Sequence, residues 1–105
     1  MSMNRQPNTT KDGRGFDQAT IEAVWRKGQA VAGYDPAVYR KDVCGAWMQR
    51  TSHGGTGDYG WEVDHILPVA KGGGDELSNL QLLQWQNNRR KADNAPNNWT
   101  CAVGG

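Results

Sequence analysis

The segment from residue 59 to residue 93 constrains the fold of this 105-residue chain more than any other part. It reads YGWEVDHILPVAKGGGDELSNLQLLQWQNNRRKAD. Trp61 and Val63 alternate with polar neighbours, which predicts a short strand. The glycines at 72–74 predict a reversal of the chain, and a second short strand is expected over residues 80–82. A helix is then expected over about 84–92, so the segment predicts a β-hairpin followed directly by a helix.

Two neighbouring side chains at the end of the first expected strand can carry out chemistry. Asp64 supplies hard oxygen ligands for a divalent cation, and His65 can take up a proton near neutral pH. Asn88 follows the second apolar run and precedes a basic cluster that could hold a phosphate. These residue types in this order suggest metal-assisted hydrolysis, as in a one-metal nuclease site.

The same segment resembles the HNH endonuclease family, whose core is a ββα-metal finger: a hairpin and a helix with one divalent ion between them. The resemblance rests on Asp64-His65 in EVDHILP, on Asn79 in SNLQLL and on Asn88 in NNRRK. The last motif position is histidine in some members and asparagine in others, so this pattern is an HNN variant. A looser likeness extends back to about Lys41.

The resemblance implies a role for each matched residue. His65 would be the general base that takes a proton from the attacking water. Asp64 and Asn88 would hold the metal ion, which would polarise a phosphate oxygen and stabilise the leaving 3′ oxygen. Asn79 would tie the loop after the first strand so that His65 is aimed correctly. A plain turn residue is the alternative interpretation of Asn79.

A basic cluster follows the last motif position. Arg89, Arg90 and Lys91 lie one to three residues after Asn88, so on a helix at least one of them should face the metal side and contact a phosphate. A solvated helix face is the alternative. His53 lies in a glycine-rich loop and matches no motif position, so it is a secondary candidate for substrate contact, with a structural role favoured.

Departures from the family pattern narrow the choice of cofactor. Many members hold a structural zinc with two Cys-x-x-Cys pairs, the second of which would fall on Gln84 and Asn87 here. Only Cys44 and Cys101 are present, so a four-cysteine structural zinc is excluded by count. A third protein ligand of some members would fall on Ala92. We therefore expect one exchangeable divalent ion in an open site, Mg²⁺ or Mn²⁺ in preference to Zn²⁺ or Ni²⁺.

Length and composition agree with a small single domain, and the resemblance implies an α+β fold with a ββα-metal core plus an N-terminal helix. A chain of 105 residues can bury one modest core. The net charge of +1 provides no global basic field, although a local patch suffices for DNA. With no long apolar stretch and no signal peptide, a cytoplasmic protein without membrane contact is expected. The two isolated cysteines fit a reducing compartment, and a disulfide between them is disfavoured.

Three regions are expected along the chain. Residues 1–15 are polar and lack apolar periodicity, which predicts a disordered arm. Residues 16–100 are expected to form the HNH nuclease domain, with the ββα-metal core at about 59–93, and residues 101–105 to fray. Within the domain, Trp61 and Trp85 are expected in the core.

The part of the domain before the motif is expected to add one helix and one strand. Asp17 or Thr20 could cap a helix that runs to about residue 30, with an apolar face at residues 21, 24 and 25. Asp35 and Pro36 predict a short helical turn, and a strand-like stretch is expected over residues 44–49.

The predicted function is a metal-dependent endonuclease that hydrolyses phosphodiester bonds in DNA. Double-stranded DNA is the favoured substrate, and a monomer without an obligate protein partner is expected, with a dimer as the alternative. The second hypothesis is an HNH-fold nucleic-acid-binding module that has lost turnover. The missing third ligand and the low net charge support that alternative.

Overall fold

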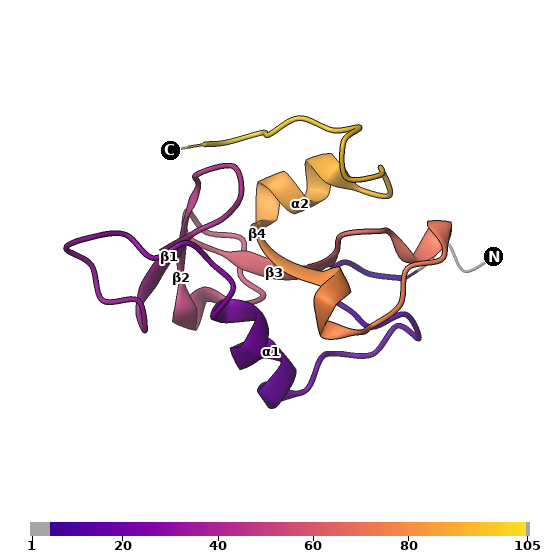
Figure 1. Ribbon diagram of the computed structural model, residues 1–105, viewed down its shortest axis with the longest axis horizontal. Helices are drawn as coiled ribbons and strands as arrows, with labels where there is room; N and C mark the ends of the chain where they lie inside the picture. The colour runs from indigo at the N-terminus through magenta and orange to yellow at the C-terminus, as the bar shows by residue number, and fades with distance from the viewer. Residues whose placement is uncertain (1–4, 105) are drawn as a thin grey trace.

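The computed structural model describes residues 5–104, and within that range the chain forms an α+β fold (Figure 1). Two helices accompany two antiparallel sheets of two strands each. In chain order the elements are α1 (Gln18–Trp25), β1 (Tyr39–Lys41), β2 (Trp47–Gln49), β3 (Trp61–His65), β4 (Leu80–Gln84) and α2 (Trp85–Lys91). None of the helices in the described range is long and apolar enough to cross a membrane.

The predicted hairpin followed by a helix is formed by β3, β4 and α2. Asp64 lies opposite Gln81, and His65 lies opposite Leu80 in the antiparallel register. β4 is longer than expected and runs directly into α2, because the side chain of Gln84 accepts hydrogen bonds from the first backbone amides of the helix. This junction lies at the end of the hairpin opposite to His65, and α2 runs back over the hairpin so that its last residue, Lys91, reaches the His65 carbonyl.

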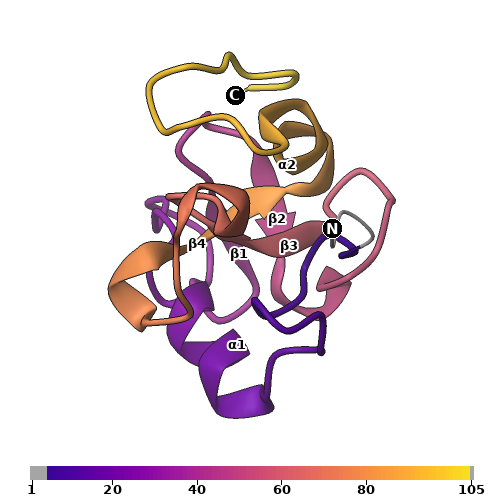
Figure 2. The ribbon, with the colours of Figure 1, turned by 90° about the vertical axis from the view of Figure 1, so that its right-hand side faces the viewer.

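The two faces of the β3–β4 hairpin have different partners. α1 lies on one side of the hairpin and α2 on the other (Figures 1 and 2). Because side chains alternate along a strand, Trp61 and Val63 share one face and Glu62 and Asp64 share the other. The apolar face joins the core, whose buried members are Ile21, Val24, Trp25, Met48, Trp61, Val63, Leu80 and Leu82. The polar face lies under α2.

Not every tryptophan expected in the core is fully buried. Trp61 is inaccessible to solvent, as predicted. Trp85 is half-buried at the start of α2, where its indole Nε1 donates a hydrogen bond to the carbonyl of Gly57 at 2.8 Å. This contact secures the glycine-rich loop before β3.

α1 is shorter than the expected helix to about residue 30. Asp17 caps it as predicted, accepting a hydrogen bond from the amide of Thr20 at 2.7 Å. The helix ends early because Gln29 exchanges two backbone hydrogen bonds with Lys41 at the edge of β1. Gly28 allows this path, since a Cβ atom there would lie 2.9 Å from the Leu82 side chain.

The part of the N-terminal arm that the structure describes is not detached from the domain. Residues 5–15 were expected to be disordered, but they are bonded to the domain. The Asn8 side chain accepts a hydrogen bond from the Val63 amide at 2.8 Å. The Lys11 amide donates to Asp75 Oδ1 at 3.0 Å. β3 is an edge strand, so its free amide needs such a partner. Residues 1–4 lie outside the described part of the arm.

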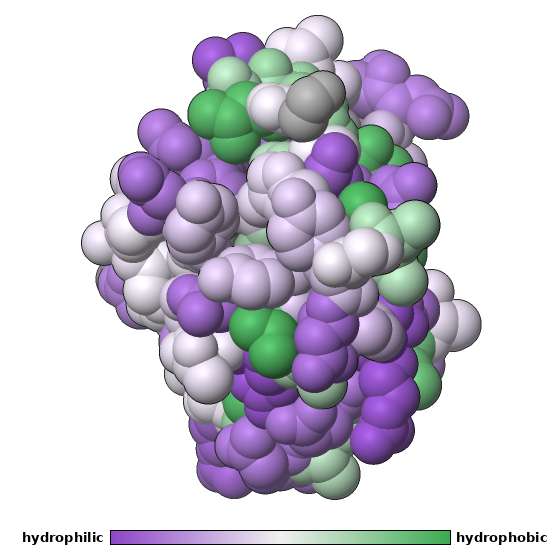
Figure 3. All heavy atoms as spheres, turned by 90° about the vertical axis from the view of Figure 1, so that its left-hand side faces the viewer, coloured by the Kyte–Doolittle hydropathy of each residue, from purple (hydrophilic) through white to green (hydrophobic). Residues whose placement is uncertain are grey.

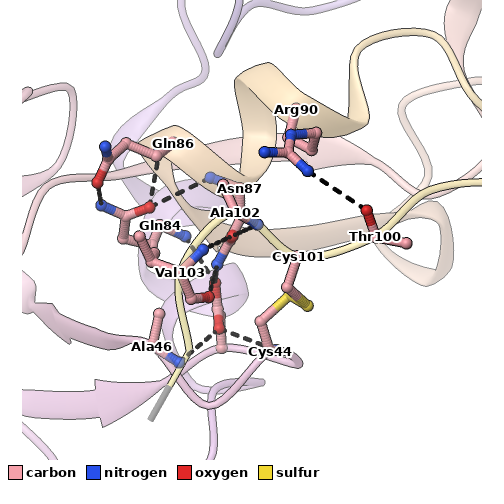
Figure 4. The surroundings of a disulfide bond; sticks show 11 residues. Cys44, Ala46, Gln84, Gln86, Asn87, Arg90, Thr100, Cys101, Ala102 and Val103 are labelled. Atoms are coloured by element: carbon pink, nitrogen blue, oxygen red, sulfur yellow. Dashed lines mark hydrogen bonds between the residues drawn. A yellow bond between two sulfur atoms is a disulfide. The ribbon is translucent and has the colours of Figure 1, made fainter.

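The C-terminal segment is held by a disulfide that the sequence did not predict. Cys44 and Cys101 are bonded, so the expectation of two unpaired cysteines is wrong (Figure 4). The Asn87 side chain also accepts hydrogen bonds from the amides of Ala102 and Val103, at 2.7 and 2.9 Å. Instead of fraying, residues 101–103 are fixed against α2, while residue 105 lies outside the description. Cytoplasmic localisation stays a prediction, without the support of unpaired cysteines.

Removing this disulfide should lower the free energy of unfolding but leave the β3–β4–α2 unit folded. The crosslink joins residues 57 positions apart, so a Cys44→Ser/Cys101→Ser variant should lose about 2–4 kcal/mol of unfolding free energy. Urea denaturation followed by tryptophan fluorescence measures this loss. Reductant should lower the urea midpoint of the wild type to about that of the double variant. The midpoint of the double variant should not change with reductant. A wild-type midpoint that ignores reductant would contradict the assignment.

Candidate active site

A cavity of about 220 Å³ lies where the N-terminal arm, the end of β3 and the end of α2 meet. Asp64 and His65 line it from β3, and Asn88 and Arg89 line it from α2. The arm supplies a further wall that includes Arg5. Three of the four predicted motif residues therefore share one cavity, although they lie up to 24 positions apart in the sequence.

Asp64 presents one engaged and one free carboxylate oxygen. Its Oδ2 accepts a hydrogen bond from Gln81 Nε2 at 3.0 Å and lies 3.2 Å from Lys91 Nζ. Burial raises the pKa of Asp64, against the lowering effects of the Gln81 hydrogen bond and the Lys91 charge. No described residue donates a hydrogen bond to Oδ1, which leaves this oxygen for a cation.

The imidazole of His65 is held by a second carboxylate. His65 is 3% exposed, and its Nε2 lies 2.7 Å from Asp75 Oδ1. Burial alone would raise the pKa of Asp75, but the hydrogen bonds with His65 and the Lys11 amide lower it below its usual value. Because the ionised carboxylate can only accept, Nε2 carries the hydrogen, and in the neutral form of the ring the lone pair is on Nδ1. Asp75 thus fixes both the orientation and the tautomer of His65.

Glu62 orients the last motif residue. The Nδ2 group of Asn88 donates to Glu62 Oε1 at 2.8 Å, so the amide oxygen of Asn88 points away from Glu62. The same carboxylate accepts from Arg89 Nη2 at 2.8 Å, and this hydrogen bond raises the pKa of Arg89. Glu62 was not among the site residues predicted from the sequence. Its position two residues before Asp64 was the available signal, because residues i and i+2 of a strand share a face.

Asn79 lies outside the cavity and closes the connection between β3 and β4. Its Oδ1 accepts from the Leu67 amide at 2.9 Å, and its Nδ2 donates to the carbonyls of Leu67 and Gly74 at 3.1 and 3.0 Å. Gly73 lies inside this closed loop, where a Cβ atom would collide with the Leu67 carbonyl. These contacts are consistent with the predicted role of Asn79 in positioning the loop after His65. Asn79 does not line the cavity, so it has no direct catalytic contact there.

The basic cluster divides into three environments. Arg89 lines the cavity, with 47% of its side chain exposed. Arg90 instead contacts Thr100, and Lys91 is fully buried, donating to the His65 carbonyl at 2.8 Å. The expectation of a phosphate contact from Lys91 is corrected by this burial, because its ammonium faces Asp64 and the backbone. Arg89 is the member of the cluster placed to meet a phosphate.

His53 has a structural environment. Its Nε2 lies 3.0 Å from Asn8 Oδ1, and its ring packs 4.8 Å from that of Trp61. Burial, followed by the charge of Arg50, lowers the pKa of His53 and favours the neutral ring. The cavity lining does not include His53, so the structural interpretation is favoured over substrate contact.

The donor atoms fit an exchangeable hard cation. Asp64 Oδ1 and the amide oxygen of Asn88 receive no hydrogen bond from the described residues, and both residues line the same cavity. Within residues 5–104 there is no group of three His, Cys, Asp or Glu side chains that could enclose an ion. Such a pair of oxygen ligands leaves most coordination positions to water and substrate, as Mg²⁺ prefers.

Comparison with known proteins gives one match. A family model described as HNH endonuclease matches residues 43–94, about half of the chain. This range includes β3, β4, α2 and all four motif residues. No curated protein and no solved structure matches the chain.

Proposed function

This chain belongs to the HNH endonuclease family, and from that premise we propose that it hydrolyses phosphodiester bonds in DNA. The observation that carries the proposal is the convergence of Asp64, His65 and Asn88 on one cavity. An ionisable ring, a carboxylate and an amide oxygen are the groups that one-metal phosphodiester hydrolysis needs. Arg89 at the cavity mouth adds a positive charge for the substrate phosphate.

His65 is proposed to activate the attacking water. The Nδ1 lone pair accepts a proton from a water molecule in the cavity as its oxygen approaches phosphorus. Asp75 keeps the hydrogen on Nε2 and stabilises the imidazolium that forms, because its carboxylate lies 2.7 Å from Nε2. Asp75 is therefore a positioning residue, and His65 is the catalytic residue.

Asp64 and Asn88 are proposed to hold one divalent ion, with Mg²⁺ or Mn²⁺ favoured. When bound, the ion supplies charge stabilisation to a phosphate oxygen and to the leaving 3′ oxygen. Asp64 Oδ1 and the Asn88 amide oxygen are the available donors, and Glu62 keeps the amide turned so that its oxygen is free. Arg89 would hold a non-bridging oxygen of the substrate while its other contact to Glu62 limits its motion.

One observation favours a second candidate function, a nucleic-acid-binding module without turnover. The Lys91 ammonium already lies 3.2 Å from Asp64 Oδ2 and partly neutralises the proposed metal ligand. A site neutralised in this way attracts a divalent ion less strongly. A binding module would retain DNA affinity but cleave nothing.

Nicking of negatively supercoiled plasmid distinguishes the two functions. With Mg²⁺ or Mn²⁺ present, we expect conversion to the open circle, and EDTA should abolish it. Parallel reactions with Zn²⁺ and Ni²⁺ test the choice of ion. DNA binding without nicking under all four metals would reject the nuclease proposal in favour of the binding module.

His65→Ala is expected to reduce nicking by about a hundredfold or more, because a positioned general base contributes that much or more to rate. The matched control is His53→Ala, which removes a histidine outside the cavity lining and should leave the rate close to that of the wild type. Initial rates at saturating metal provide the measurement, with melting curves to confirm folding. Equal nicking by His65→Ala and wild type would eliminate His65 as the base.

A further inference from the structure

A second surface, away from the cavity, gathers aromatic side chains on the outer face of the β1–β2 sheet. Lys41 lies opposite Trp47 in the register, and Tyr39 is two residues before Lys41, so these three share a face. Met48, on the opposite face, is completely buried. Tyr34 and Tyr59 flank the sheet. We call this surface the aromatic face; its members are Tyr34, Tyr39, Lys41, Trp47 and Tyr59.

The rings of the aromatic face form a continuous series. Tyr34 lies 4.8 Å from Trp47 between ring centroids, Trp47 lies 6.2 Å from Tyr39, and Tyr39 lies 6.2 Å from Tyr59. Tyr34 and Tyr59 at the two ends are 52% and 46% exposed. The face contains all three tyrosines of the chain. Figure 3 views the side of the molecule on which β1 and β2 lie, where residues of intermediate hydropathy cover much of the middle.

The aromatic face has one charged member, Lys41. Lys41 Nζ lies 4.8 Å from the centroid of the Trp47 ring, which places a cation beside the aromatic series, whose inner rings Tyr39 and Trp47 are only partly exposed. The whole chain carries a net charge of only +1. Binding to a paired duplex depends chiefly on several phosphate contacts, whereas unpaired bases also bind by stacking on aromatic rings. The composition of the face therefore favours binding to unpaired bases over binding to the phosphates of a duplex.

We propose that the aromatic face binds the unpaired bases of a DNA strand, so that the substrate is single-stranded or locally unpaired. This inference rests on the proposed nuclease function and specifies its substrate class, in contrast to the double-stranded DNA expected from the sequence. The half-exposed rings of Tyr34 and Tyr59 would stack against bases, and Lys41 would contact a backbone phosphate.

The aromatic face is connected to the cavity by β3. Tyr59 lies six residues before His65, and an extended chain of that length spans about 20 Å. Between them, the Tyr59 carbonyl accepts a hydrogen bond from the Gln49 amide of β2, which links the two sheets. Because every residue of β3 is buried, a DNA strand bound on the aromatic face would reach the cavity over the surface of the domain.

The test measures binding apart from cleavage. Fluorescence anisotropy of a labelled oligothymidylate is recorded with His65→Ala protein in EDTA, so that neither metal nor turnover contributes. Tyr34→Ala and Tyr59→Ala should each weaken binding about fivefold to a hundredfold, the loss expected for one stacked base. Leu77→Ala is the matched control, because Leu77 is 46% exposed and lies outside the face. Tyr59→Leu, which keeps apolar bulk without the ring, should behave like Tyr59→Ala.

Three further arms decide among ligands. An abasic strand of the same length and a fully paired duplex should both bind at least about tenfold more weakly than the oligothymidylate. Affinity for the oligothymidylate should depend weakly on salt, with a logarithmic slope of about −1, because Lys41 is the cation on the face. Equal binding of duplex and single strand, or tyrosine variants that bind normally, would overturn the proposal. Self-association lost in Tyr34→Ala, with DNA binding intact, would also overturn it by assigning the face to a second copy.

The outcomes separate this proposal from the nuclease function. Stacking without plasmid nicking would leave the aromatic face established and reject turnover. Plasmid nicking by the wild type, together with normal DNA binding by the tyrosine variants, would support the nuclease function and reject the aromatic face as a binding site. Melting curves for each variant exclude loss of fold as the cause, because the two end tyrosines are about half exposed and should contribute little to stability.

Discussion

Asp42→Ala is expected to lower the free energy of unfolding by about 4 kcal/mol or more, a large share of the stability of a small domain. Asp42 is 2% exposed. Its Oδ1 accepts from the amides of Cys44 and Ala46, both at 2.9 Å, and its Oδ2 accepts from the Gln84 amide at 2.9 Å and from Asn87 Nδ2 at 3.0 Å. Alanine would remove this acceptor from the three backbone amides and would leave Asn87 Nδ2 with only its hydrogen bond to the Val103 carbonyl.

The position of Asp42 explains why one carboxylate matters so much. It joins the loop after β1 to Gln84, the cap of α2, and to Asn87. Asn87 in turn holds the C-terminal segment through hydrogen bonds with Ala102 and Val103 (Figure 4). Gln84 and Asn87 are the positions at which the family resemblance would place a zinc-binding cysteine pair. A hydrogen-bonded cluster centred on Asp42, reinforced by the disulfide, therefore occupies the region where a metal-stabilised relative would hold zinc.

Urea denaturation monitored by tryptophan fluorescence tests this prediction, with Asp58→Ala as the matched control. Asp58 is exposed, so its replacement should change the unfolding free energy by less than about 0.5 kcal/mol. Asp42→Asn, which keeps one carbonyl acceptor, should fall between the two. If Asp42→Ala proved as stable as Asp58→Ala, the cluster would not be the element that joins α2 to the loop.

Local signals explain which parts of the fold could be predicted. The alternation before Asp64, the glycines at 72–74 and the basic helix gave the β3–β4–α2 unit within a few residues. The end of α1, the path of the arm and the disulfide could not be predicted in this way. Each depends on one contact between distant residues: Gln29 with Lys41, Asn8 with Val63, and Cys44 with Cys101. Periodicity and turn chemistry contain no information on such contacts.

The candidate site shows the same division. The motif residues came from resemblance, and the structure brings three of them to one cavity. Glu62 could have been found from the two-residue period of β3. Asp75 could not, because it lies in the connection between the strands, whose path depends on the side-chain hydrogen bonds of Asn79. The burial of Lys91 follows from helical spacing, since it lies three residues after the buried Asn88, but its pairing with Asp64 required the structure.

Lys91→Met is expected to destabilise the metal-free protein by about 3–5 kcal/mol, because it removes one partner of a buried ion pair. Lys91 is fully buried, and its Nζ lies 3.2 Å from Asp64 Oδ2 while donating to the His65 carbonyl at 2.8 Å. Methionine nearly preserves the packed volume but cannot supply a charge. The pKa of Asp64, already raised by burial, should rise further when the neighbouring ammonium is gone.

A double-mutant cycle isolates the charge pairing from lost packing. Asp64→Asn alone should also destabilise the protein, because it leaves the buried ammonium unpaired, whereas adding it to Lys91→Met should recover about 2 kcal/mol or more. Urea unfolding in EDTA provides the four free energies. Arg90→Met serves as the control for removing a cation from α2, since Arg90 is exposed and donates a hydrogen bond to Thr100 Oγ1. Purely additive effects of the Lys91 and Asp64 changes would mean that the two groups do not interact, and that Lys91 stabilises the site through the His65 carbonyl alone.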